Sequence, residues 1–154
     1  MKKSRIVMLI FGILMTVFIF SQSLLKANES STLSNGITTF IYDFLKYLNI
    51  NIEINNLHHI IRKLGHFSEF FLLSIIWSLY YQLNNKIKFP FIITFIQGLI
   101  TAIIDETIQT FIPGRSGELL DVLIDTSGVI FGILIIYIIQ IIIVKNKNNK
   151  ISSN

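Results

Sequence analysis

Ionisable residues and one glutamine gather in three stretches of a largely apolar sequence. They are Arg62, Lys63, His66 and Glu69, then Asp105, Glu106, Gln109 and Arg115, then Asp121 and Asp125. A charged side chain near the centre of a bilayer costs about 2.5–3.5 kcal/mol on insertion scales, so it is rare there unless it is paired, solvated or functional. These stretches are therefore the first candidate for a functional site.

Three kinds of chemistry fit these residue types. Arg62, Lys63 and Arg115 suit an anionic headgroup or cell-wall precursor, because a guanidinium binds carboxylate or phosphate oxygens at two points. The carboxylates together with His66 suit a divalent cation, since oxygen ligands favour magnesium, manganese or calcium and an imidazole keeps zinc open. His66 beside a carboxylate also suits acid–base catalysis near neutral pH.

Two further interpretations need no ligand. A buried ion-pair network would only fix the register of the helices, and a proton or ion pathway would need more polar groups in the inner halves of the helices. The sequence thus leaves the metal unknown and does not separate a binding protein from an enzyme. The candidate catalytic residues are His66, Glu69, Asp105, Glu106, Asp121 and Asp125; the candidate ligand-binding residues are Arg62, Lys63, Gln109, Arg115, Ser21 and Gln22.

The composition indicates a membrane protein. Of 154 residues, 52% are hydrophobic and 14% are charged, whereas soluble domains carry about 25% charged residues. Cysteine is absent, which excludes disulfides, thiolate metal sites and a cysteine nucleophile. The net charge of +4 comes from basic residues that flank apolar runs, so it indicates membrane topology rather than nucleic-acid binding. We expect one membrane domain over residues 1–144 and a disordered cytoplasmic tail over 145–154.

Four apolar segments are long enough, or nearly so, to cross a bilayer. A spanning helix needs about 20 mostly apolar residues, and the segments are 6–25, 66–83, 89–112 and 119–144. The shortest, 66–83, is expected to extend its helix backwards into the interface. The sequence therefore predicts an all-α integral membrane protein, a four-span helical bundle.

The distribution of lysine and arginine places both termini in the cytoplasm. With this orientation eight basic residues lie inside and five outside, and the tightest clusters are all inside, as the positive-inside rule requires. The acidic residues, with His66 and Arg115, then lie in the outer half. We expect a bacterial cell-membrane protein whose polar site faces outward, in contact with membrane lipids.

Aromatic and aliphatic residues add two expectations. Between the first two spans, Ile37, Phe40 and Phe44 recur at helical spacing, which predicts an outer interfacial helix or, alternatively, a helix packed on the bundle. Trp77 and the neighbouring Tyr80-Tyr81 pair are typical of an aromatic belt at the inner boundary.

The spacing predicts that the charged residues meet. Arg62, His66 and Glu69 are four and three residues apart, so they share one helical face. The third and fourth spans carry similar polar stripes at the same outer end, and the glycines four apart at Gly128 and Gly132 suit close helix contact. Ser21-Gln22 ends the first span on that side and would complete a pocket.

These stretches resemble the VanZ-like family of small bacterial membrane proteins. The matching segments are IRKLGHFSEF at 61–70, DETIQTFIPGRSG at 105–117 and DVLIDTSG at 121–128, with Phe20-Ser21-Gln22 at the end of the first span. The resemblance implies a multi-span envelope protein of a family named for low-level resistance to the glycopeptide teicoplanin. It implies the same charged residues as the working set and assigns none of them a role.

Overall fold

The computed structural model describes residues 2–25, 27–84 and 87–152, and its regular elements there are all helices. The five helices are α1 Lys2–Ser23, α2 Ala27–Tyr47, α3 Ile54–Gln82, α4 Pro90–Thr110 and α5 Leu119–Ser152. The all-α prediction is therefore confirmed for the described part of the chain. Lys26 and Lys86, which entered the charge count, lie outside it.

Three of these helices are long and apolar enough to cross a membrane. They are Lys3–Ser23 in α1, Pro90–Thr110 in α4 and Leu119–Asn146 in α5. The segment expected as a fourth span lies in α3, whose apolar run is interrupted by charged and polar side chains. Three membrane-type helices are thus confirmed, and the fourth span stays a prediction.

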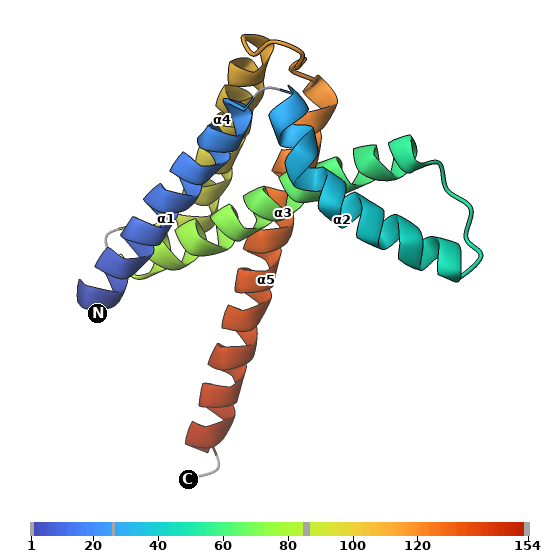
Figure 1. Ribbon diagram of the computed structural model, residues 1–154. Coiled ribbons are helices and arrows are strands. Elements are labelled where there is room, and N and C mark those ends of the chain that lie inside the picture. Colours follow the sequence, from blue (N-terminus) through green and yellow to red (C-terminus); the bar gives the residue numbers. More distant parts are fainter. Residues whose placement is uncertain (1, 26, 85–86, 153–154) are drawn as a thin grey trace.

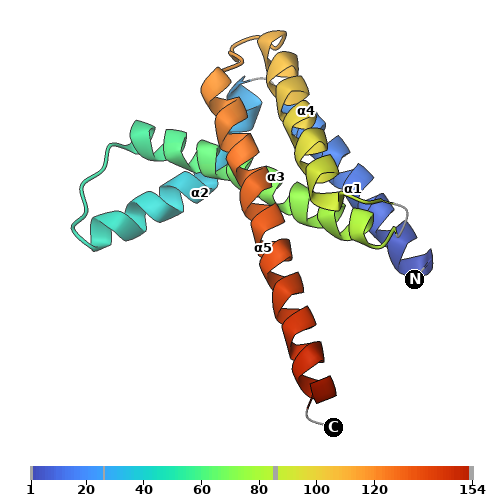
Figure 2. The same cartoon turned by 180° about the vertical axis from the view of Figure 1, so that it is seen from behind.

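Helix α3 lies at the centre of the arrangement and contacts each of the other four helices. Both views show it crossing α5 obliquely, while its first half forms an arm with α2 that extends sideways from the bundle (Figures 1 and 2). The ends of α1 and α4 and the start of α5 lie together at one end of the molecule (Figure 1). The three charged stretches of the sequence meet near this end of the molecule.

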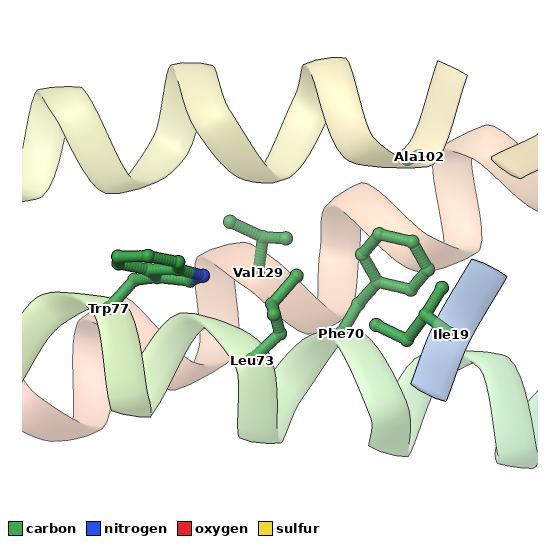
Figure 3. Close-up of a cluster of buried hydrophobic side chains, with 6 residues drawn as sticks. All are labelled: Ile19, Phe70, Leu73, Trp77, Ala102 and Val129. Carbon is green, nitrogen blue, oxygen red and sulfur yellow. The ribbon is translucent and has the colours of Figure 1, made fainter. Parts of the chain in front are cut away.

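The apolar core lies between α1, α3, α4 and α5, and it includes an aromatic residue expected elsewhere. Trp77 is 8% exposed and belongs to a buried cluster with Ile19, Phe70, Leu73, Ala102 and Val129 (Figure 3). A Cβ built on Gly12 of α1 would lie 2.8 Å from Cε2 of Trp77, so the glycine makes room for the indole. The aromatic-belt prediction is therefore wrong for Trp77, which packs inside the bundle.

Close contact between α3 and α5 depends on small residues of α5. A Cβ on Gly128 would lie 3.1 Å from the backbone nitrogen of Phe71, and one on Gly132 would lie 2.6 Å from the carbonyl oxygen of the same residue. Glycine lets two helix backbones approach where any side chain would hold them apart. The predicted role of these glycines is confirmed, and this crossing sets the distances in the charged cluster.

The helix predicted between the first two spans exists as α2, with its apolar side chains outward. Ile37, Phe40 and Phe44 are all exposed, while Thr38 is buried. Its position at the outer membrane interface stays a prediction. At the other end of the chain α5 continues to Ser152, into the polar segment 145–154, for which disorder also stays a prediction.

Candidate functional site

Helices α3, α4 and α5 bring most of the predicted charged residues together near the end of α1. The side chains of α4 and α5 in this cluster are almost fully buried: Asp105, Glu106, Gln109, Asp121 and Asp125. An ionised carboxylate buried without a partner is costly. The partner of each carboxylate therefore determines what the site can do.

Asp121 forms ion pairs with two basic residues of α3, Arg62 and Lys63. The Nζ atom of Lys63 contacts its Oδ1 directly, and Nη2 of Arg62 lies 3.6 Å from its Oδ2. Lys63 also lies 3.7 Å from Oε2 of Glu118. These ion pairs join α3 to the start of α5. The positive charge of Lys63 is thus neutralised by carboxylates of the protein itself.

Asp105 and Glu106 are held by neutral donors. The amide nitrogen of Gln109 donates to Oδ2 of Asp105 at 2.9 Å and to Oε1 of Glu106 at 3.0 Å. The Ser23 hydroxyl donates to Oδ1 of Asp105, and the backbone N–H of Glu118 donates to Oε2 of Glu106 at 2.9 Å. Both carboxylates are thereby oriented without being neutralised by these donors.

Asp125 lies fully buried beneath them. Nδ1 of His66 is 3.4 Å from its Oδ1, within ion-pair distance, but neither oxygen of Asp125 has a hydrogen-bond partner among the described residues. One donor atom from each of His66, Asp105, Glu106 and Asp125 lies within 4.8 Å of all the others. These four residues, hereafter the acidic cluster, are the group among the described residues that could hold a metal ion.

Arg115 lies in the loop between α4 and α5 and docks on the end of α1. Its Nη1 donates to the carbonyl oxygen of Gln22 at 2.9 Å and to that of Leu25 at 3.5 Å, where a helix end leaves carbonyls unsatisfied. Burial, followed by the nearby charge of Arg62, lowers the pKa of Arg115 from its ordinary value. The loop turns through Gly114, whose φ of 80° favours glycine.

A cavity of about 340 Å³ lies beside these groups. It is hereafter the site pocket. Its polar lining comprises Gln22, Ser23, Arg62, His66, Glu69, Asp105 and Arg115, and its apolar lining includes Phe18, Ile37 and Ile61. Two arginines and two members of the acidic cluster thus line one cavity with aliphatic and aromatic side chains.

The sequence profile of the VanZ/LLP1 family matches residues 6–140, which include every candidate site residue. The chain belongs to the VanZ/LLP1 family. Comparisons with curated proteins and with solved structures gave no match. Family membership together with the apolar helices makes this a VanZ-like membrane protein of the cell envelope.

In this VanZ/LLP1 protein one predicted site residue lies apart from the cluster. Ser21 is exposed and its hydroxyl donates to the carbonyl oxygen of Phe18 at 2.7 Å, whereas Gln22 lines the pocket. Two participants, Ser23 and Glu118, were missed. Ser23 lies four residues after Ile19, which is in the core, and this helical spacing is the signal that would have found it.

Proposed function

We propose that this VanZ/LLP1 protein binds the anionic headgroup of an envelope lipid or lipid-linked wall precursor in the site pocket, and thereby lowers sensitivity to glycopeptides such as teicoplanin. The main support for this proposal comes from the two arginines that line the pocket. The Nε atoms of Arg62 and Arg115 are both buried and lack a hydrogen-bond partner among the described residues. Buried donors usually have partners, so an acceptor-rich headgroup would complete the site.

The mixed lining of the pocket supports a ligand with a polar head and an apolar tail. Arg62 and Arg115 offer planar groups suited to phosphate oxygens, and Phe18, Ile37 and Ile61 offer surface suited to an acyl or isoprenoid chain. Ile37 belongs to α2, whose apolar side chains are exposed. A lipid entering along α2 would meet the arginines with its headgroup.

The proposal includes an orientation. Both termini lie in the cytoplasm and the site faces outward, because the basic residues favour that side for the start of α1 and the end of α5. An outward site is placed where lipid-linked wall precursors are used and where glycopeptides act.

The test compares Arg115→Ala with the wild type in two assays. In detergent, native mass spectrometry measures retention of undecaprenyl phosphate and phosphatidylglycerol, with phosphatidylcholine as the neutral reference. Losing a charge-assisted hydrogen bond costs about 1.5–3 kcal/mol, so affinity for the anionic lipids should fall by about tenfold or more. In a susceptible bacterium, the same variant should lose the teicoplanin tolerance given by the wild type.

Arg5→Ala is the matched control, since Arg5 is an exposed arginine of α1 in the stretch of basic residues at its start. It should behave as the wild type in both assays. Wild-type retention of anionic lipid by an Arg115→Ala variant that is expressed and folded normally would contradict the proposal.

A membrane-embedded enzyme acting on the same class of lipid is the second candidate. The position of His66 and Asp105 favours it, because an imidazole and a carboxylate line the pocket that would hold the substrate and imidazole–carboxylate pairs serve acid–base chemistry. The same lipid samples distinguish the two functions. Release of phosphate or headgroup over time indicates an enzyme, and intact bound lipid indicates a binding protein.

A further inference from the structure

The acidic cluster holds more negative charge than its surroundings neutralise. Arg62 and Lys63 form their ion pairs with Asp121 and Glu118. In the part of the chain that the structure describes, no lysine or arginine ion-pairs with Asp105, Glu106 or Asp125, and only His66 approaches one of them. Three buried carboxylates facing one imidazole leave a site that lacks positive charge.

The second observation is that Asp125 has no hydrogen-bond partner among the described residues, although Nδ1 of His66 lies 3.4 Å from its Oδ1. Asp125 is fully buried, and both of its oxygens lack a hydrogen-bond donor among the described residues, as does Nδ1 of His66. A carboxylate that only fixed helix register would be expected to take a donor from a neighbouring helix. One oxygen of Asp125 lies within 4.8 Å of a potential ligand atom from each of the three other residues.

The spacing of these atoms fits one metal ion. Ligand atoms lie about 2.0–2.2 Å from zinc and about 2.3–2.6 Å from calcium, so two ligands of one ion are separated by at most about 4.4 Å around zinc and about 5.2 Å around calcium. The donor atoms of the acidic cluster all lie within 4.8 Å of one another, so they need to close by only about 0.4 Å to surround a zinc ion. One imidazole among three carboxylates favours a transition metal over magnesium or calcium, which take oxygen ligands.

The neighbours of the cluster resemble the outer shell of a metal site. Gln109 fixes Asp105 and Glu106 through one amide nitrogen, Ser23 fixes the second oxygen of Asp105, and the Glu118 N–H fixes the second oxygen of Glu106. Each carboxylate oxygen has two lone pairs, so these bonds leave capacity for an ion. Outer-shell bonds of this kind orient the ligands.

We propose that His66, Asp105, Glu106 and Asp125 form a binding site for one divalent transition-metal cation, zinc or manganese. The cation supplies the positive charge that the three carboxylates lack. His66 and Asp105 also line the site pocket, so the ion is reachable from it and adds positive charge beside Arg62 and Arg115. This last step rests on the proposed binding of an anionic headgroup, whereas cation binding itself does not.

The experiment uses the full chain, purified in detergent, treated with a chelator and dialysed against ZnCl2, MnCl2, MgCl2 or CaCl2. Elemental analysis should find about one zinc or manganese ion per chain, bound more tightly than magnesium or calcium. Asp125→Asn, which keeps the size of the side chain, should weaken binding at least tenfold, and Glu106→Gln should do the same. Asp43→Asn is the matched control, because Asp43 is an exposed aspartate of α2, and it should bind as the wild type.

Thermal unfolding of the same samples gives a second readout. It distinguishes a loss of cation binding from misfolding of the variant. Without metal, Asp125→Asn should raise Tm, because it removes a buried charge whose oxygens have no hydrogen-bond partner among the described residues. With zinc or manganese, the wild type should gain Tm and the variant should not. A wild-type protein that binds no more ion than Asp125→Asn, or an Asp125→Asn variant that binds and gains Tm as the wild type does, would overturn the proposal.

Arg115→Ala separates this proposal from the lipid-binding one. The variant should lose anionic lipid and still bind the cation, since Arg115 donates to carbonyls of the α1 end and to no ligand atom of the acidic cluster. Cation binding without lipid binding in the wild type would refute only the lipid proposal, and the reverse result would refute only the cation site.

Discussion

Replacing Gly128 by alanine should separate α3 from α5, two of the three helices that contribute residues to the acidic cluster. The new Cβ would lie 3.1 Å from the Phe71 nitrogen and 3.2 Å from the Phe67 carbonyl carbon, and closer still to the Phe67 carbonyl oxygen. Non-bonded atoms prefer about 3.5–4.0 Å, and the obstacles are backbone atoms that cannot rotate away. Helices α3 and α5 must therefore move apart by roughly 0.5–1 Å at this point.

Moving the two helices apart lowers the free energy of unfolding, whereas alanine in place of glycine within a helix raises it. Overpacking costs about 1–3 kcal/mol, and a backbone obstacle favours the upper end, while alanine in place of glycine in a helix returns about 1 kcal/mol. The free energy of unfolding should thus fall by about 2 kcal/mol. Because His66 on α3 already lies 3.4 Å from Asp125 on α5, the same movement should also weaken cation binding.

Unfolding by sodium dodecyl sulfate in mixed micelles, followed by circular dichroism, measures this difference. Gly36→Ala is the control, because nothing lies within 4 Å of a Cβ at this position of α2, and it should stabilise the protein by about 0.5–1 kcal/mol. If Gly128→Ala were as stable as Gly36→Ala, the crossing of α3 and α5 would not be as close as described, and the geometry of the cluster would have to be revised.

Two further predictions concern the ion pairs and the orientation. Asp121→Asn should lower the free energy of unfolding by about 3 kcal/mol, the low end for breaking a buried pair, because Lys63 retains its ion pair with Glu118. If this variant were as stable as the wild type in detergent unfolding, Asp121 would not form a stabilising ion pair. Since the chain has no cysteine, a single introduced thiol reports its side of the membrane. In intact cells an impermeant maleimide should label Asn51→Cys and leave Lys88→Cys unlabelled, and the opposite pattern would invert the proposed topology.

The sequence was sufficient to predict which charged residues of α3 share a face, since that depends only on the helical period. Arg62, His66 and Glu69 all line the site pocket. The partner of each residue could not be predicted, because it depends on how far α5 is rotated and how closely it crosses α3. Lys63 therefore meets Asp121 while His66 meets Asp125, and neither pairing follows from spacing within one helix.

Two other differences between prediction and structure arise from contacts between helices, which the local sequence pattern does not specify. Trp77 was expected at the membrane interface because its residue type is common there, but Gly12 leaves a space in α1 that the indole fills. Ser21 and Gln22 were predicted because they end the first span, and Ser23 was not considered. Only the rotation of α1 on the bundle, fixed by Ile19 in the core, directs Ser23 to Asp105.

The length of α5 has a consequence for how this protein sits in a bilayer. Its membrane-type segment, Leu119–Asn146, has 28 residues, about 42 Å at 1.5 Å per residue, against a hydrocarbon thickness of about 30 Å. The corresponding segments of α1 and α4 have 21 residues each, about 32 Å. Hydrophobic mismatch thus favours tilting of α5 relative to α1 and α4, in agreement with its divergence from them away from the site (Figures 1 and 2). A tilt of α5 would change how it crosses α3 at Gly128, so membrane thickness should act on the spacing of the acidic cluster.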